Sequence, residues 1–428
     1  MISNYIFTIR QFNHNIHMYL IATALLGFTV DGGIYSVLFN LYLLRLGHDP
    51  ELIGMINSAA LLTFAIFSLP AGMIGSRWGS RQVMIIGLTM MLVGCSLLPL
   101  AEFGPASWQV GWLIGSYVVA FLGLALYFVN AAPFAMSVAP PEERSHVFSV
   151  QVALWSLAGF AGSLVGGLLP SFFSSILDVS LNEPAPYRYP LLIAAILTIP
   201  GILAILTTTS PEENVAPPSK LELAAGVNLA QVGKAAIGLI ILMAFIRMLQ
   251  VTSMGATSTF FNVYLDTSLQ VPTLQIGLLS AMGRLLAAAA AMATPLLTAR
   301  KGHGAVVIWA SVGGALFMLP LALLPHWSAA GLGFVGMVAL SSVRYSAFLV
   351  YSMELISPKL RAAMSGAGEM AAGLSFSFMA LSGGYLISLF GFTSLFLMGA
   401  ALSILGTLLF WLYDRRPRRQ LAYQTSES

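Results

Sequence analysis

Charged residues are scarce in this sequence. Asp, Glu, Lys and Arg make up 8% of the 428 residues, whereas hydrophobic residues make up 58%. Soluble globular domains carry about 25% charged residues, so this composition excludes soluble hydrolases, nucleic-acid binders and disordered tails. The formal net charge of +3 does not require an acidic partner, because basic residues of a membrane protein first report its topology.

Cysteine is nearly absent. Cys95 is the single cysteine and lies in an apolar run, so an intramolecular disulfide and a cysteine metal cluster are both excluded. The six histidines fall near predicted helix ends or in loops, without metal-ligand spacing. Glycine-rich phosphate loops, nucleophile elbows and paired catalytic carboxylates are missing too. We therefore expect neither an enzyme nor an ATP-driven pump, and no metal or cofactor.

Long apolar segments dominate what is present. A helix needs about 20 apolar residues to cross a bilayer, and twelve segments bounded by charge, Pro or Gly meet that length. The sequence therefore predicts an all-α membrane protein with twelve transmembrane helices. The segments are 17–44, 52–74, 82–101, 110–136, 147–173, 188–208, 235–265, 273–298, 304–325, 329–353, 364–388 and 392–413.

The stretch between the sixth and seventh segments is the interior part richest in charge and proline. We interpret residues 209–234 as a cytoplasmic linker. It divides the chain into an N-terminal six-helix bundle, 1–208, and a C-terminal bundle, 235–428, with a short basic tail.

The basic residues predict the orientation. Residues 1–17 lack the compact signal-peptide pattern, and we interpret them as a cytoplasmic lead-in. With both termini in the cytoplasm, only Arg45 and Arg188 fall on the outer side, Arg45 forming a solvated pair with Asp49 or Glu51. This bias predicts a multi-pass protein of the plasma (inner) membrane. Fourteen of the 19 basic residues then lie on the inner side: Arg10, Arg77, Arg81, Arg144, Lys220, Lys234, Arg300, Lys301, Lys359, Arg361, Arg415, Arg416, Arg418 and Arg419.

The two halves repeat each other in register. The segment Phe39–Leu43 recurs 222 positions later as Phe261–Leu265, and Ile53-Gly54 recurs 223 later as Ile276-Gly277. Further matches are Arg77-Trp78-Gly79 with Arg300-Lys301-Gly302, and Pro141, Arg144 and Gly166-Gly167 with Pro358, Arg361 and Gly383-Gly384. A parallel duplication of six helices is the layout of a transporter whose halves rock around a central site.

The segment after the second span resembles a family signature. Gly72–Arg81 is similar to the loop 2–3 sequence G-x-x-x-D-R-x-G-R-R of the major facilitator superfamily, and the resemblance covers essentially the whole chain. Ser76 stands where the family usually has Asp, and Ser80 where it often has a basic residue. The resemblance implies a gating role for the loops that contain Gly72, Ser76, Arg77, Gly79 and Arg81, and Arg300 and Gly302 in the repeat. We expect Arg77 to hold the inner ends of the halves together.

A second element leaves two interpretations open. Gly162–Gly167 is similar to the G-P-x-x-G-G element of proton-coupled antiporters, with Ser163 replacing proline. Glycines also let membrane helices approach closely, and plain packing is the favoured interpretation.

Four charges lie near the bilayer centre, where each costs about 2.5–3.5 kcal/mol on insertion scales. At 1.5 Å per residue, Asp31 is ~21 Å into the first span, Arg247 ~18 Å into the seventh and Arg284 ~16 Å into the eighth, and Arg344 lies ~15 Å from the inner end of the tenth. The charges can form structural ion pairs, with Glu369 or Glu354 taking a further arginine. Three arginines against one central acid instead favour a visiting anion.

Helical spacing places these charges on polar stripes, and the resemblance implies that spans 1, 4, 7 and 10 line a central cavity bordered by span 8. Ordinary packing is the alternative for the aromatic members. The candidate residues for substrate binding and coupling are Asp31, Tyr35, Tyr127, Asn130, Arg247, Gln250, Arg284, Arg344 and Tyr351.

Two classes of function remain. The favoured one is a secondary transporter that moves an amphipathic organic anion by alternating access, with Asp31 as proton-coupling residue; a proton-coupled exporter of lipophilic cations is the alternative. The second class is a non-transporting sensor or lipid-handling protein. We expect a monomer in the lipid bilayer whose partners are a small-molecule substrate and a coupling proton, and no nucleic acid.

Overall fold

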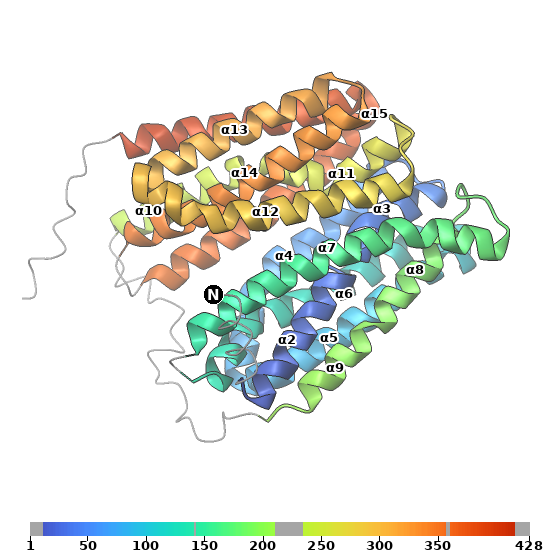
Figure 1. The fold of residues 1–428 in the computed structure, drawn as a ribbon, viewed down its shortest axis with the longest axis horizontal. Coiled ribbons are helices and arrows are strands. Elements are labelled where there is room, and N and C mark those ends of the chain that lie inside the picture. The colour runs from blue at the N-terminus through green and yellow to red at the C-terminus, as the bar shows by residue number, and fades with distance from the viewer. Residues whose placement is uncertain (1–11, 141–142, 210–233, 357–359, 416–428) are drawn as a thin grey trace, which may run out of the picture.

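The computed structural model describes residues 12–140, 143–209, 234–356 and 360–415, and this part of the chain is almost entirely helical, without a strand. The first half contains a 3₁₀ helix, Leu98–Phe103, and eight α-helices (Figure 1). They are α2 (His14–Thr29), α3 (Ile34–Arg45), α4 (Pro50–Trp78), α5 (Ser80–Leu97), α6 (Ala106–Val138), α7 (Arg144–Leu177), α8 (Ala185–Ile196) and α9 (Thr198–Leu206).

The second half ends in a helix of 54 residues, far too long for one crossing: at 1.5 Å per residue it measures ~80 Å, against a hydrocarbon core of about 30 Å. Gly391, with φ 77°, breaks it into two spans. The expected gap between 388 and 392 is confirmed, and with the last helix divided there the described residues contain the expected twelve spans. The helices are α10 (Lys234–Gln250), α11 (Thr252–Thr267), α12 (Thr273–Lys301), α13 (His303–Leu323), α14 (Trp327–Glu354) and α15 (Arg361–Asp414).

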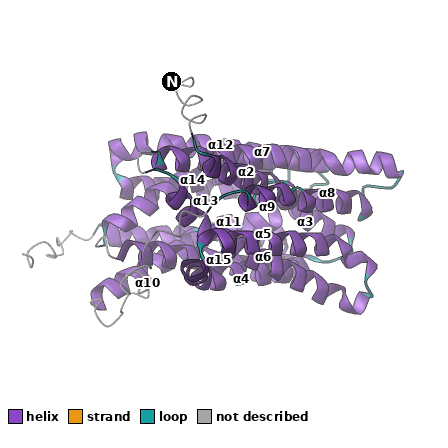
Figure 2. Cartoon of the chain, turned by 90° about the horizontal axis from the view of Figure 1, so that it is seen from below, coloured by secondary structure: helices purple, strands orange, loops and turns teal. Residues whose placement is uncertain are grey.

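The two halves lie side by side, with α2–α9 in one bundle and α10–α15 in the other (Figure 1). Seen from below, the long helices run roughly parallel (Figure 2). Helix α4 packs on α15 and α7 packs on α12 across the interface. We call the two ends of the bundle the Arg45 end and the Arg77 end. The predicted division into 1–208 and 235–428 stays a prediction, and nearly all of the predicted linker, 210–233, lies outside the described residues.

Glycines related by the duplication lie at both helix crossings between the halves and allow close packing there. A Cβ on Gly277 of α12 would come within 2.6 Å of the Gly167 Cα on α7. At the equivalent crossing, a Cβ on Gly54 of α4 would lie 3.3 Å from the Gly384 Cα on α15, and one on Gly384 would lie 2.5 Å from the Pro50 carbonyl. Close helix approach through small residues is typical of membrane interfaces, so here the Gly162–Gly167 segment serves packing.

The first helix of each half is broken near the middle of its span, which the apolar pattern of the sequence does not predict. Helix α2 ends at Thr29 and α3 begins at Ile34, with Gly32 at φ 86°. The Ser36 hydroxyl accepts from the Gly32 N–H (2.7 Å) and donates to the Val30 carbonyl (3.0 Å). It thereby satisfies backbone groups that the break frees, as the membrane interior demands. In the second half, Val251 separates α10 from α11.

Candidate functional site

Asp31 lies in the break between α2 and α3 and faces Arg284 of α12. The two charges are 3.8 Å apart, with side chains 47% and 34% exposed. The Arg284 guanidinium lies against the backbone of Gly32 and leaves no room there for a Cβ. Because Asp31 belongs to the first half and Arg284 to the second, this ion pair joins the halves near mid-depth.

Arg247 of α10 is held inside the second half. Its Nη2 donates to Glu369 Oε1 of α15 at 2.7 Å, and the Tyr345 hydroxyl of α14 donates to the same oxygen at 3.2 Å. The guanidinium carbon also lies 5.0 Å from the centre of the Tyr345 ring, a cation–π distance. Arg247 is 5% exposed and Glu369 46% exposed. Of the two acids that the sequence offered, Glu369 is thus the partner; Glu354 instead faces His303 at 3.7 Å.

Arg344 of α14 is the exception among the three arginines. It is 5% exposed, and it has no hydrogen bond or ion pair with any residue that the structure describes. The nearby charge acting on it is Arg247, which repels it. A buried guanidinium without a counter-charge is costly in a membrane protein, so this position favours an anion.

Gln250, the last residue of α10, is a second buried group without partners. The side chain is 2% exposed, and neither its amide oxygen nor its amide nitrogen has a hydrogen-bond partner within the described ranges. It lies three residues after Arg247, one helical turn along α10. Buried amides are normally hydrogen-bonded, so Gln250 offers an unused donor and an unused acceptor one helical turn from Arg247.

Tyr35 contributes to a different place, a cavity of about 130 Å³ between the halves. The Tyr35 hydroxyl donates to the Cys95 carbonyl. The lining carries no charge and combines aromatic rings, amides and hydroxyls, among them Tyr35, Phe39, Asn40, Asn57, Tyr117 and Ser258.

The other predicted binding residues have structural partners. Tyr127 Oη is 3.3 Å from Thr23 Oγ1. Asn130 donates to the carbonyls of Ala71 (3.1 Å) and Leu126 (2.9 Å), which ties α6 to α4. The Tyr351 hydroxyl donates to Asp414 at 2.8 Å. Their contact with substrate stays a prediction.

The loop signature lies at the end of α4. Gly79 and its repeat Gly302 both end a helix in left-handed conformation, with φ 86° and 78°. Gly72 lies opposite Val129 of α6, and Ser76 Oγ donates to the Met73 carbonyl at 2.9 Å. Arg81 donates to the Leu206 carbonyl at 2.7 Å and so ties α5 to the end of α9.

Arg77 and Arg300 are exposed, and neither has a hydrogen bond or ion pair to a residue in the described ranges. That Arg77 joins the inner ends of the halves therefore stays a prediction.

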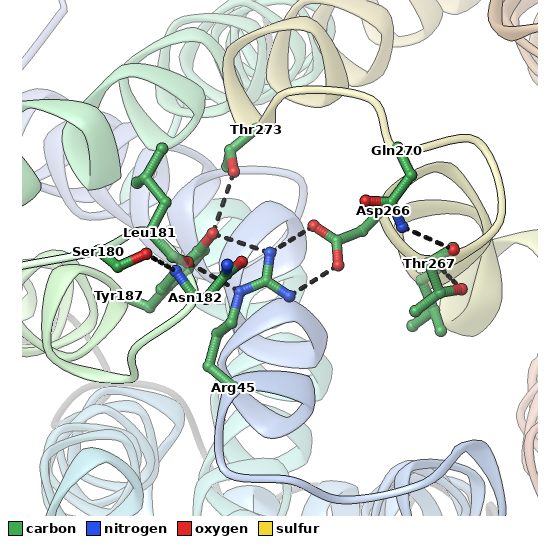
Figure 3. A network of polar contacts seen from close by, with 10 residues as sticks. Arg45, Ser180, Leu181, Asn182, Tyr187, Asp266, Thr267, Gln270 and Thr273 are labelled. Carbon is green, nitrogen blue, oxygen red and sulfur yellow. Dashed lines mark hydrogen bonds and ion pairs between the residues drawn. The ribbon is translucent and has the colours of Figure 1, made fainter.

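Arg45 joins the halves instead, and its expected pairing with Asp49 or Glu51 is wrong. Two of its nitrogens bind the Asp266 carboxylate of α11 at 2.7 and 2.5 Å (Figure 3). Arg45 also donates to the Leu181 carbonyl (2.9 Å) and the Tyr187 hydroxyl (3.2 Å), which is 3.2 Å from Thr273 Oγ1. Asp49 caps α4 by accepting from the Leu52 N–H. We call the Arg45–Asp266 pair with Tyr187 and Thr273 the Arg45 latch.

The repeated asparagines form a reciprocal clasp beside this latch. Asn40 donates to the Thr259 carbonyl of α11 at 2.7 Å, and its repeat Asn262 donates to the Ser36 carbonyl of α3 at 2.9 Å. The duplicated segments thus face each other, which was the signal that could have located the partner of Arg45: Asp266 directly follows the repeat of Phe39–Leu43.

Within the described residues, no group of three or more His, Cys, Asp or Glu side chains could hold a metal ion. The polar side chains near mid-depth carry guanidinium, carboxylate, amide and hydroxyl groups.

Known proteins resemble this chain in sequence and fold. The chain is 29% identical over 155 residues to a glucose/galactose transporter of Brucella abortus, which is 35% of this chain and 36% of that protein; it thus matches about a third of that relative's length. A D-xylose–proton symporter superposes with a TM-score of 0.74 at 16% identity, covering 95% of this chain and 97% of the other. A nucleoside transporter superposes with a TM-score of 0.72 at 16% identity, covering 94% and 99%.

These likenesses show the fold, and a family model supplies the assignment. The model described as Major Facilitator Superfamily matches residues 20–371, which includes most of the repeated segments, the loop signature, the break between α2 and α3 and all three central arginines. The described helices that are long and apolar enough to cross a membrane agree with this match. This protein belongs to the Major Facilitator Superfamily.

Proposed function

We propose that this protein moves a small amphipathic organic anion across the inner membrane by alternating access, with proton coupling and with both termini in the cytoplasm. The observation that carries the proposal is Arg344, a buried guanidinium at mid-depth without a partner among the described residues and beside a second guanidinium. An anion bound between Arg344 and Arg247 would supply the missing counter-charge. Because Asp31 already faces Arg284, a lipophilic cation has no free carboxylate there.

The test is ligand binding to the purified protein, with a panel of aromatic and aliphatic carboxylates, phosphates, neutral sugars and lipophilic cations. Guanidinium holds an oxyanion through two hydrogen bonds, which lysine cannot reproduce. Arg344→Lys and Arg247→Lys should therefore weaken anion binding about 10- to 100-fold, the equivalent of the roughly 1.5–3 kcal/mol of a charged hydrogen bond. The exposed Arg300→Lys is the matched control, and Arg284→Lys should be mild. A preference for lipophilic cations, with the variants binding as wild type, would overturn the proposal.

A neutral polyhydroxylated solute is the second candidate, and the uncharged cavity beside Tyr35 favours it. Its amides and hydroxyls can exchange hydrogen bonds with sugar hydroxyls, while rings such as Phe39 and Tyr117 offer flat apolar faces. Relatives named for glucose, galactose and xylose agree with this chemistry. Sugar binding that Asn57→Ala abolishes and Arg344→Lys leaves intact would select this candidate.

A further inference from the structure

Glu369 binds one of the two arginines that the proposed anion site would use. The inference drawn from this contact rests on the proposed function. Its Oε1 accepts from Arg247 at 2.7 Å and from Tyr345 at 3.2 Å, so the ionised carboxylate occupies a guanidinium that an incoming anion needs. Glu369 lies eight residues into α15, closer to the Arg77 end than Arg344, and its side chain is 46% exposed. It can therefore exchange protons more readily than the buried arginines.

The charges around Glu369 come from two helices. Helix α15 packs on α4, α10, α11, α13 and α14. Helix α10 presents Arg247 to Glu369 and α14 presents Tyr345, while Arg344 of α14 is close enough to Arg247 to repel it. The part of α4 opposite this turn, Ala65–Leu69, contains no titratable residue. Helix α11 contacts α15 farther along, at Phe376 and Met379, and α13 contacts it at Thr393. Two guanidiniums and one carboxylate therefore give this site a charge of +1 when Glu369 is ionised.

We propose that Glu369 is the proton switch of the anion site. Ionised Glu369 holds Arg247. When a proton from solution neutralises the carboxylate, the ion pair is lost, and Arg247 can turn with Arg344 to the anion. One proton enters with each monoanion, so the site carries +1 before and after binding. An unchanged net charge avoids the large cost of adding charge at low dielectric.

This role differs from that of Asp31. Asp31 and Arg284 lie on opposite halves, so loss of that pair accompanies motion of the halves. Arg247, Glu369 and Tyr345 lie on one half, so their rearrangement requires no such motion and can change affinity alone. Glu369 should set the pH dependence of equilibrium binding, whereas Asp31 should set that of transport.

The experiment measures binding of benzenesulfonate, acetate and benzoate to the full-length protein over a pH series. In wild type, sulfonate affinity should fall about tenfold per pH unit once Glu369 is ionised, as one-proton linkage requires. Glu369→Gln keeps an acceptor for Tyr345 and should bind anions at high pH as tightly as wild type does at low pH, with no slope. Proton uptake on binding should fall from one per anion to none.

Three variants keep the result interpretable. Glu369→Asp should restore the slope, whereas Asp31→Asn and Glu354→Gln should leave it unchanged. Thermal unfolding checks that each variant is folded. If Glu369→Gln does not fold, the test rests on the slope measured for Glu369→Asp. Anion binding by wild type with the same slope in Glu369→Gln would overturn this inference alone. If no anion in the panel or in the carboxylate and phosphate series binds wild type at any pH, the proposed function fails, and the switch fails with it.

Discussion

The arginines near the interface and at mid-depth have three different environments. Arg45 forks onto Asp266, Arg247 and Arg284 each face one carboxylate, and Arg344 has no partner within the described part of the chain. The sequence predicts the same mid-membrane depth for Arg247, Arg284 and Arg344. It cannot distinguish their partners, because position along a helix does not reveal which helices are neighbours. The surplus of positive charge was nevertheless visible in the composition of the spans, and it is what makes Arg344 informative.

At this scale the prediction concerns Asp31. Asp31→Asn removes the charge that faces Arg284 across the halves, so transport should lose its response to an imposed pH gradient while equilibrium binding stays within about twofold. Uptake into proteoliposomes with and without a pH gradient measures the response of transport. Titration of the detergent-solubilised protein measures equilibrium binding. Asp178→Asn, at the exposed end of α7, removes the same charge outside the membrane and should change neither. Gradient-driven accumulation that persists in Asp31→Asn would remove Asp31 from coupling.

At the scale of elements, the sequence predicted what is linear along the chain. The length of the apolar segments predicts spans such as 329–353, and the corresponding helix in the structure is Trp327–Glu354. The duplication predicts the paired turns at Gly79 and Gly302. The break at Val251 was hidden because its neighbours carry neither Gly nor Pro. At this break the Thr252 hydroxyl lies within hydrogen-bond distance of two carbonyls, that of Leu249 at 2.8 Å and that of Gly399 on α15 at 2.9 Å. Pairings such as Arg45 with Asp266 depend on how the halves meet, which hydropathy does not encode.

The helix crossings yield the element-scale prediction. In Gly277→Ala the new Cβ would lie 2.6 Å from the Gly167 Cα and 2.7 Å from the Ser163 carbonyl. Both are backbone atoms that cannot move aside, so overpacking should cost about 1–3 kcal/mol. We expect a lower unfolding temperature in detergent and a slower transport rate. Gly115→Ala on α6 meets nothing within 4 Å and is the control. Equal stability of the two variants would show that the α7–α12 crossing tolerates separation.

For the whole molecule, the described contacts define a state with the halves joined at the Arg45 end. The Arg45 latch, the clasp of Asn40 and Asn262, and the glycine crossings all bring the halves together there. Rocking of two halves around a central site requires that these contacts open for the site to reach that side. The Arg45 latch therefore stabilises the state closed at the Arg45 end relative to the state open there. Weakening the latch should change the populations of these two states.

Spin labels on the two halves can measure that equilibrium. Asn182→Cys and Ser268→Cys, both exposed at the Arg45 end, would be introduced after Cys95→Ala, which leaves the backbone carbonyl that Tyr35 binds. Asp266→Asn weakens a bidentate charged contact of about 1–3 kcal/mol, so a population with longer interlabel distance should grow about 5- to 150-fold. Combining Arg45→Asp with Asp266→Arg should restore the short distance in part. Arg188 pairs with Glu102 inside the first half, so Arg188→Ala should leave the distances unchanged. A distribution in Asp266→Asn identical to that of wild type would mean that the latch does not control opening, and that the closing energy resides in the glycine crossings and the asparagine clasp.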